Sequence, residues 1–461
     1  MALRILIFLT ACTACLSKAS GAWRQPKLDS CILHPDLEAR IAKDVSIWSD
    51  GGISEEVGLS VVSSCDLNKM PPDLKPEQNC NKAQRILVEN GTVYLTNIAN
   101  TVHMSLDERI GFLVELYQTS QEYNLPNVEF THWFDDIPSG SLAFGPDGKS
   151  LWPFPPAGCM PPVMAWSKWK ECSVLLVPNS GHFRCVRDGF DELEALLENI
   201  ATSVPWNERL PVAFGRWSNF CPHFLEKLTT ADGKPMKCPR THYEELSKQH
   251  SHLLDMRDRK DGHELPIQHQ NRFRYLVSTD GLSVSCKLEK YLLLGSALLK
   301  TNSSVFAYFY DALKPYEHYL PVMVKSSDDI LEMVPWMRAN DERVHAIAQR
   351  GQEFALNNLH REARLCYIFR LIKELSKKMG YKPTCKRREL CVPLVHEIKF
   401  LAGDKRTSMR CEYQSVLSRF GNSDDAVATG RRAKEYDFKD LGRLHDGGNA
   451  WPRDDLLKDK P

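Results

Sequence analysis

The segment Asn271–Val322 reads NRFRYLVSTDGLSVSCKLEKYLLLGSALLKTNSSVFAYFYDALKPYEHYLPV. It opens with an apolar-alternating run, Phe273–Val277, which is typical of a strand and ends at the turn signal Asp280-Gly281. The amphipathic run Lys287–Leu294 then predicts a helix, and a new apolar strand is predicted to start at Ala297. The segment therefore predicts one strand–helix–strand unit.

The expected helix begins and ends at recognisable signals. Ser283 and Ser285 precede it and offer a polar N-terminal cap, and Gly295-Ser296 ends it. The first turn of such a helix has free N–H groups that can bind a phosphate. An ordinary strand–helix unit of an α/β core would show the same local pattern, so both interpretations stay open at this point.

Length and charge limit the class of protein. A chain of 461 residues is long enough for two domains of ordinary size. Its 59 basic and 59 acidic side chains balance, which argues against a nucleic-acid partner. The hydrophobic content of 43% is typical of a soluble globular protein.

The N-terminus has the features of a secretory signal peptide. Residues 1–22 contain Arg4, an apolar run from Ile5 to Leu16, and the small residues Ala19 and Gly21. An uncleaved anchor is the alternative, but the run is short, and no later stretch reaches the roughly 20 apolar residues of a span. We expect the secretory pathway, in the lumen of the endoplasmic reticulum or Golgi or secreted, and no membrane span after cleavage.

Cysteines and sequons agree with that compartment. Without Cys12 and Cys15 of the signal, 13 of the 15 cysteines remain, so disulfides are expected and at least one cysteine is free or intermolecular. The CxxC pair lies within the signal itself, which argues against a zinc or thioredoxin-like site. Asn90-Gly91-Thr92 and Asn302-Ser303-Ser304 are expected N-glycosylation acceptors.

Alternating strand and helix patterns in both halves predict two α/β domains with a cleft between them. The boundary is expected at Val204-Pro205-Trp206. The stretch Lys234–His269 is rich in histidine but has no metal-binding frame, and we interpret it as a solvated loop and helix. The clearest further patterns predict strands at 86–94, 127–134 and 210–214, and helices at 107–124, 188–201, 326–338, 340–359 and 363–379.

Many residues of the opening segment and beyond also carry a family likeness. They are Tyr275-Leu276, Asp280-Gly281, Ser283, Ser285, Tyr291, Gly295-Ser296, Phe309-Tyr310, Leu313-Lys314-Pro315, His318-Tyr319, Pro321-Val322, Ala339-Asn340-Asp341, Ile347-Ala348, Arg350-Gly351 and Phe354. In this pattern the chain closely resembles glycosyltransferase family 90, the Rumi-type protein O-glucosyltransferases and their fungal capsule-associated and plant relatives. The clear match covers about 273–359, and a weaker one extends back to about 127.

The resemblance implies a GT-B fold, in which two Rossmann-like domains face each other across a cleft. It implies an N-terminal acceptor-side domain (23–205), a C-terminal UDP-sugar donor domain (206–392), and a helical return to the N-terminal domain (393–420). A loosely ordered tail (421–461) is expected from its polar, Gly-rich composition. The family works without a metal or other cofactor, and its acceptors are Ser or Thr of EGF-like repeats, or glycans.

The resemblance also implies roles for particular residues. The Asp of an Asp-x-Pro sequence is the general base in Rumi-type enzymes, and here Asp136-Ile137-Pro138 matches it, with Asp135 adjacent. A capped turn before Pro138 is the structural alternative. The expected donor contacts are Arg216, Ser218, Asp280, Gly281, Ser283, Ser285 and Lys287.

Three departures from the family pattern concern the donor side. The expected Arg is Lys287, which keeps the charge but loses the bidentate fork. Ala307 stands where the family has an acidic residue, and the order around Gly215-Arg216 is changed. From the resemblance we expect an inverting enzyme that transfers a sugar, glucose or xylose, from UDP to a hydroxyl. The alternative is a catalytically inactive binding protein, a lectin or assembly factor.

Overall fold

The computed structural model describes much of the chain between residues 27 and 403. The expected signal peptide (1–22), the expected bases Asp135 and Asp136, and the expected tail (421–461) lie outside the described residues. The described residues are 27–63, 83–96, 106–134, 162–169, 174–179, 190–197, 199, 204–219, 238–261, 265–281, 283–303, 305–388 and 391–403.

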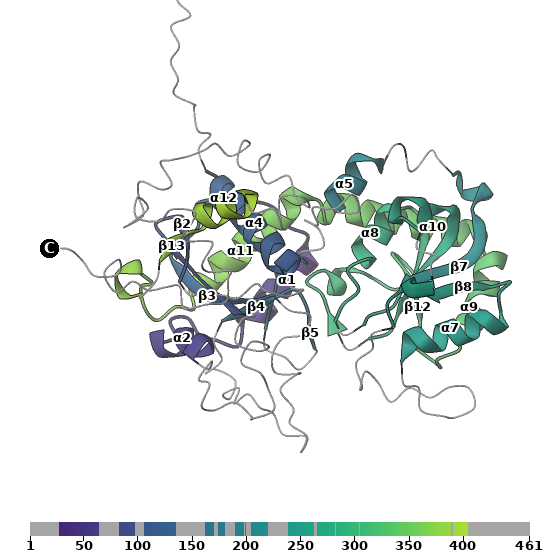
Figure 1. Ribbon diagram of the computed structural model, residues 1–461, viewed down its shortest axis with the longest axis horizontal. Coiled ribbons are helices and arrows are strands. Elements are labelled where there is room, and N and C mark those ends of the chain that lie inside the picture. The colour runs from purple at the N-terminus through teal and green to yellow at the C-terminus, as the bar shows by residue number, and fades with distance from the viewer. Residues whose placement is uncertain are drawn as a thin grey trace, which may run out of the picture.

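Two larger β-sheets lie side by side along the long axis of the molecule (Figure 1). We call the elements around the six-stranded sheet the first half and those around the five-stranded sheet the second half. A third sheet of two short strands joins them, because β5 of the first half (Lys168–Trp169) pairs antiparallel with β11 of the second (Val305–Phe306).

The sheet of the first half is mixed. Its strand order is β13-β2-β1-β3-β4-β6, in which β3, β4 and β6 are parallel and the pairs β1–β3, β1–β2 and β2–β13 are antiparallel. This antiparallel part differs from the parallel sheet expected of a Rossmann-like domain. The strands are β1 (Ala83–Glu89), β2 (Thr92–Leu95), β3 (Val128–Trp133), β4 (Val163–Ala165), β6 (Leu175–Leu176) and β13 (Val392–Pro393).

The single strand predicted over 86–94 is wrong. The structure has a hairpin instead, in which β1 and β2 meet at Asn90-Gly91. Both residues have positive φ, 51° for Asn90 and 75° for Gly91, which is the geometry of a two-residue type I′ turn. Asn-Gly is the preferred sequence for that turn because both residues tolerate the left-handed conformation.

The sheet of the second half is parallel throughout. Its order is β12-β10-β9-β7-β8, which in chain order is the doubly wound arrangement 2-1-3-4-5. The helices α7 (Pro239–Gln249), α8 (Leu288–Leu293), α9 (Ile330–Ala339) and α10 (Asp341–Asn358) belong to this half. The strands are β7 (Leu210–Trp217), β8 (Leu254–Asp258), β9 (Phe273–Ser278), β10 (Ala297–Thr301) and β12 (Leu320–Val322).

The strand–helix–strand unit predicted at 273–301 is confirmed as β9, α8 (Leu288–Leu293) and β10, with β9 and β10 parallel. The amphipathic character expected of the helix is wrong, because all six of its residues are buried, Glu289 and Lys290 included. The serine cap is also wrong. The N-cap residue is Lys287, and Ser285 contributes its backbone carbonyl, which accepts the Leu288 N–H at 3.1 Å.

The two faces of the second sheet pack into different apolar cores. Phe214, Leu276 and Leu298 belong to a large core that continues through α8 into the first half. Ala213 and Tyr275 point the opposite way, into a separate core under α7, α9 and α10. Because one core is shared, packing as well as chain connection holds the halves together.

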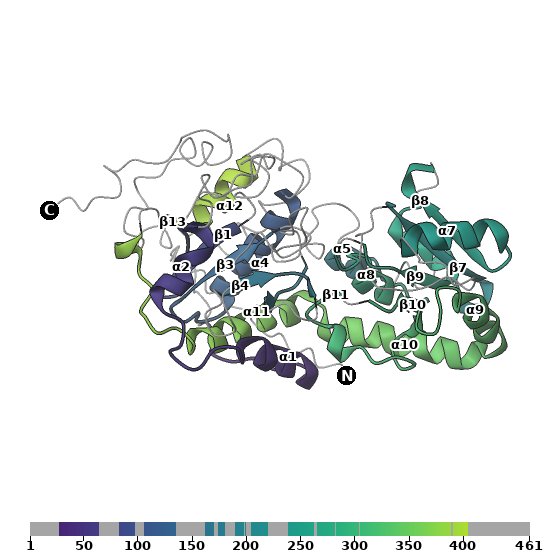
Figure 2. The same ribbon diagram turned by 90° about the horizontal axis from the view of Figure 1, so that it is seen from below.

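The chain returns to the first half at α11 (Arg361–Ser376), which follows α10 directly along one side of the molecule (Figure 2). Helix α11 packs against α1 (Pro35–Val45) and α4 (Leu106–Glu122), and the disulfide Cys31–Cys366 fixes it there. The return was expected at 393, so α11 reaches the first half earlier along the chain. The helix α12 (Leu394–Gly403) follows β13 and contacts α4 and β2.

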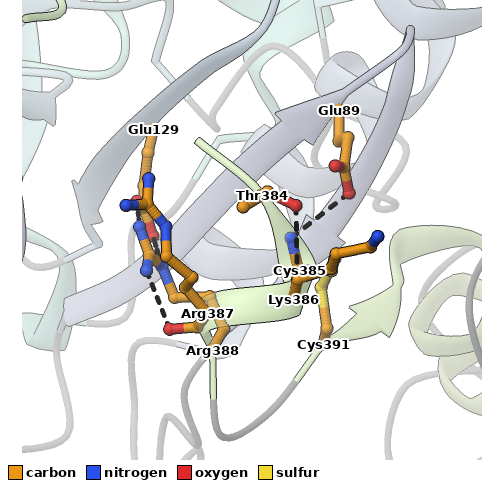
Figure 3. The surroundings of a disulfide bond; sticks show 8 residues. All are labelled: Glu89, Glu129, Thr384, Cys385, Lys386, Arg387, Arg388 and Cys391. Carbon is orange, nitrogen blue, oxygen red and sulfur yellow. Dashed lines mark hydrogen bonds and ion pairs between the residues drawn. A yellow bond between two sulfur atoms is a disulfide. The ribbon is translucent and has the colours of Figure 1, made fainter. Parts of the chain in front are cut away.

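A second disulfide closes the segment between α11 and β13 (Figure 3). It joins Cys385 to Cys391, and Arg388 lies within the loop that it closes. Arg388 donates to both carboxylate oxygens of Glu129 on β3, at 2.9 and 2.5 Å, and to Glu55 at 2.9 Å. Among the described residues, no helix is long and apolar enough to cross a membrane.

Candidate functional site

The order of the second sheet locates a ligand site before any side chain is considered. The chain leaves β7 toward β8 on one side and returns to β9 on the other, so the order reverses between β7 and β9. In open parallel sheets of this kind, ligands bind outside the carboxyl ends of the strands at that switch point. Ser218 follows β7 and Thr279-Asp280-Gly281 follow β9, so expected donor contacts from two distant segments meet there.

Arg216 is held under this edge by the neighbouring strand. Its side chain is 5% exposed, and its Nη1 donates to the carbonyls of Gly215 and Asp255, each at 2.8 Å. Its Nη2 donates to Asp255 Oδ1 at 2.9 Å, and the guanidinium lies 4.2 Å from the centre of the Phe214 ring. Burial lowers the pKa of Arg216, although Asp255 opposes the shift.

Lys287 is brought to the same point from the start of α8. Its Nζ donates to the backbone carbonyl of Arg216 at 2.7 Å. This bond fixes the position of the ammonium group at the end of β7. Two expected donor contacts that are 71 residues apart in the sequence therefore touch.

Arg240 was not found by the sequence analysis, yet it joins the two strand ends. From α7 its Nη1 donates to the Ser218 carbonyl at 2.8 Å, and its Nη2 donates to the Thr279 carbonyl at 3.1 Å. A Cβ atom at Gly281 would lie 2.6 Å from Arg240 Nη2. Gly281 is thus required for this close approach, but no local pattern indicates which distant side chain needs the space.

Asp280 is buried beside these cations, with 4% of its surface exposed. Its Oδ1 accepts the Ser285 N–H at 2.7 Å and the Tyr310 hydroxyl at 3.1 Å. Its Oδ2 is buried with no hydrogen-bond partner among the described residues. Burial, and then the Asp280 charge, raise the pKa of Tyr310 well above its ordinary value, so the Tyr310 hydroxyl stays a donor. A buried carboxylate oxygen without a partner is a candidate acceptor for a donor group of a ligand or for an ordered water.

The remaining expected positions are placed as follows. Ser283 is 4% exposed, and its carbonyl accepts the Gly281 N–H at 2.9 Å, which closes the turn after β9. Ala307 is buried in the shared core, where its carbonyl accepts the Tyr310 N–H at 3.2 Å. Asn90 and Asn302, the two expected glycosylation sites, are both exposed.

The catalytic base cannot be placed in the same way. Asp135 and Asp136 lie outside the described residues, but β3, which precedes them, spans Val128–Trp133 and confirms the strand predicted over 127–134. No cluster of three or more His, Cys, Asp and Glu side chains that could hold a metal ion occurs among the residues that the structure describes. Metal independence stays a prediction.

Comparison with known proteins assigns the chain to a class. The model of glycosyl transferase family 90 matches residues 72–424, which is well over half of the chain and includes every strand of both sheets. The chain therefore belongs to glycosyl transferase family 90. The resemblance inferred from the opening segment is confirmed, and a parallel second sheet with a ligand edge fits an α/β glycosyltransferase.

Particular relatives are distant. Protein O-glucosyltransferase 1 of Rattus norvegicus is 25% identical over 265 residues, which cover 57% of this chain and 60% of that protein. Protein O-glucosyltransferase 1 of Homo sapiens is 23% identical over 347 residues, covering 72% and 78%. Protein O-glucosyltransferase 3 of Mus musculus is 36% identical over 113 residues, covering 24% of this chain and 22% of that protein.

Proposed function

We propose that the protein is an inverting glycosyltransferase that moves glucose or xylose from a UDP-sugar to a Ser or Thr hydroxyl of a protein, or to a glycan hydroxyl. One observation carries the proposal. Arg216, Arg240 and Lys287 meet at the switch point of the parallel sheet, where Lys287 and Arg240 donate to backbone carbonyls of the strand ends. A leaving diphosphate develops negative charge, and fixed cations at that position would stabilise it.

The donor would be held by several complementary contacts. The diphosphate would lie against Lys287 and Arg240, while Arg216 supports them from β7. The unpaired Asp280 Oδ2 would accept a hydrogen bond from a hydroxyl or N–H group of the nucleotide sugar. Ser218, Gly281, Ser283 and Ser285 form the backbone rim of this site. The charge is supplied by side chains, so no metal ion or other cofactor is invoked in the proposal.

The chemistry needs a base on the opposite side of the sugar. We assign it to Asp136, with Asp135 as the next candidate, because both follow β3 of the first half. The carboxylate would take the proton of the acceptor hydroxyl while that oxygen attacks the anomeric carbon and UDP leaves. This division of labour fits a GT-B arrangement, with the donor on the second half and the base on the first.

Acceptor and compartment belong to the same proposal. The relatives are named for O-glucosylation of proteins, and an EGF-like repeat is the acceptor that we would test first. The predicted signal peptide, the disulfides and the exposed sequon residues Asn90 and Asn302 fit the lumen of the endoplasmic reticulum or Golgi.

The experiment combines binding and turnover in the full chain. UDP should raise the melting temperature of the protein, and UDP-glucose or UDP-xylose should label an EGF-repeat or glycan acceptor. Asp136→Asn should abolish transfer and keep the UDP-induced shift, whereas Asp135→Asn should retain transfer. If Asp136→Asn keeps most of its turnover, the base is elsewhere.

A catalytically inactive binding protein is the second candidate. Lys287, Ala307 and the changed order around Gly215-Arg216 favour it, because each departs from the family pattern on the donor side. It predicts no melting shift with UDP at millimolar concentration and no transfer from either sugar nucleotide. A clear UDP shift would reject it.

A further inference from the structure

Cys286 is a free cysteine at the candidate donor site. It is partly exposed and lies between Ser285 and Lys287. Elsewhere in the described chain, Cys31–Cys366 and Cys385–Cys391 are disulfides, and Cys238 is also disulfide-bonded. Outside the expected signal peptide the number of cysteines is odd, so at least one must stay unpaired within a single chain, and among the described cysteines Cys286 is free.

Both neighbours of Cys286 are tied to the strand ends. The Ser285 N–H donates to Asp280 Oδ1 after β9, and Lys287 Nζ donates to the Arg216 carbonyl at the end of β7. The segment that carries the thiol therefore spans the switch point of the sheet. The Tyr310 hydroxyl donates to the same Asp280 Oδ1 at 3.1 Å, so the residue that precedes the thiol is held at the Tyr310–Asp280 pair.

A second observation indicates that a ligand occupies this place. Asp280 is more than nine-tenths buried, and its Oδ2 has no hydrogen-bond partner among the described residues. The other oxygen of the same carboxylate holds the backbone of Ser285, next to the thiol. A ligand that donates to Oδ2 would therefore bind next to the carboxylate that holds Ser285, and a group attached to Cys286 would compete with it.

We propose that Cys286 is a thiol modification site that controls access to the donor site. It would form a mixed disulfide with a small anionic disulfide of the glutathione disulfide class, and the adduct would exclude the nucleotide sugar. The inference rests on the proposed donor site for its consequence, but the reaction at the thiol does not depend on it.

The reaction balances as a thiol–disulfide exchange. Cys286 loses its proton, and the thiolate sulfur attacks one sulfur of the small disulfide. A new sulfur–sulfur bond forms, the old one breaks, and the leaving thiolate takes up a proton. Cys286 is oxidised, and one half of the small disulfide is reduced to a thiol.

The charges of the site favour this class of reagent. Lys287 and Arg240 would attract the carboxylates of glutathione disulfide as they would attract a diphosphate. The adduct would then place its carboxylates against the cations that the nucleotide needs. Steric and electrostatic competition act in the same direction, and reduction of the mixed disulfide would reverse both.

The test uses the full chain with its disulfides intact. The protein is incubated with glutathione disulfide, the modified peptide is identified by mass spectrometry, and UDP binding is measured by thermal shift before and after. We expect one adduct at Cys286 and an at least tenfold weaker response to UDP. Cys286→Ser should fold, should take up no adduct at this peptide, and should keep its UDP shift after the same treatment.

Labelling by N-ethylmaleimide gives a second measurement. UDP should slow alkylation of Cys286 severalfold without slowing alkylation of the unfolded chain. The inference is overturned if Cys286 takes up neither reagent in the folded protein, or if the glutathionylated protein keeps its full UDP shift. If untreated protein shows no UDP shift, the proposed donor site fails, and this outcome is distinct because it appears before any modification.

Discussion

Two regions of the molecule, the core of the first half and the carboxyl edge of the second sheet, hold cationic side chains through different partners. In the first half, charged side chains are buried in pairs: Arg364 with Glu115 (0% and 2% exposed), Arg388 with Glu129, and Lys168 with Asp44. At the carboxyl edge of the second sheet, Lys287 and Arg240 donate to backbone carbonyls. The first set of cations is held by carboxylates, and the bonds just described at the sheet edge are to carbonyls.

The difference separates structural charge from charge that can act on a ligand. Removing one member of a buried pair leaves an uncompensated ion, so the first half should lose stability. Removing a cation held by carbonyls leaves groups that water can satisfy, so the second half should lose affinity and keep its fold. The following experiments test that separation, beginning with the largest effect.

Breaking the Arg364–Glu115 pair should have the largest effect. Arg364→Met leaves Glu115 buried without its partner, and we expect a loss of about 3–5 kcal/mol in the free energy of unfolding. Chemical denaturation measures the loss. Adding Glu115→Leu should restore much of it, since the double variant buries no lone charge.

The matched control lies on the same helix. Arg361 pairs with Glu362 at the surface, where the side chains are 27% and 55% exposed, and Arg361→Met should cost less than about 1 kcal/mol. A double variant no more stable than Arg364→Met alone would contradict the role assigned to the buried pair.

Removing a cation at the second sheet should act on binding. Lys287→Ala or Arg240→Ala removes one charge-assisted contact worth about 1.5–3 kcal/mol, which is roughly a 10–100-fold weaker UDP affinity. Titration calorimetry gives the affinity, and the melting temperature without UDP should change little. Lys248→Ala on α7 is the control, because it removes an exposed charge away from the strand ends.

Gly281→Ala should reproduce part of the Arg240 effect. The added Cβ would lie 2.6 Å from Arg240 Nη2 and displace the guanidinium, so we expect UDP affinity to fall severalfold. In an Arg240→Ala background the same substitution should add little, because the two changes act on one contact. Full additivity in that double-mutant cycle would contradict the bridging role of Arg240.

The smallest expected effect is a pH dependence where the halves meet. Burial lowers the pKa of His318, and its Nδ1 accepts the Lys314 N–H at 3.0 Å, which protonation would break. The neutral form is thus favoured in the folded state. The stability that neutral His318 contributes is present above pH 6.5 and is lost as the pH falls through the lowered pKa of His318. Nearby groups that modulate this shift are Glu317, Arg350, His34 and Lys314.

His318→Asn keeps a hydrogen-bond acceptor but cannot titrate. We expect the melting temperature of the variant to fall less steeply than that of the native protein below pH 6.5. Melting curves at several pH values measure the slopes. Equal slopes would assign the pH dependence to other groups.

Local sequence patterns predict individual strands and helices well, but they predict poorly which distant elements these pack or pair with. The β9–α8–β10 unit, β3, α4, α10 and α11 are confirmed, because periodicity and turn residues are local signals. Asn90-Gly91 carries two signals at once, a type I′ turn and a glycosylation acceptor, and the apolar alternation over 86–94 hides the hairpin. The buried Glu289 and Lys290 made α8 look amphipathic, and only tertiary packing shows that both faces are covered.

The donor edge was predictable in part for the same reason. Asp280, Gly281, Ser283, Ser285 and Lys287 form one continuous signal, and the structure places them together. Arg240 lies 39 residues before Thr279, the residue whose carbonyl it holds, and its role depends on strand order, which no local pattern contains. The chemistry of Asp135 and Asp136 stays a prediction from the family resemblance.

The disulfide Cys31–Cys366 has a consequence for the timing of synthesis. The two cysteines are 335 residues apart, so at 5–20 residues per second the first leaves the ribosome about 20–70 s before its partner. The whole second sheet, residues 210–322, emerges within that interval. During it, Cys31 is exposed to every cysteine that emerges later, and a wrong bond must be exchanged before α11 arrives. The first half begins to be synthesised before the second, yet its disulfide can form only after nearly the entire chain has been made.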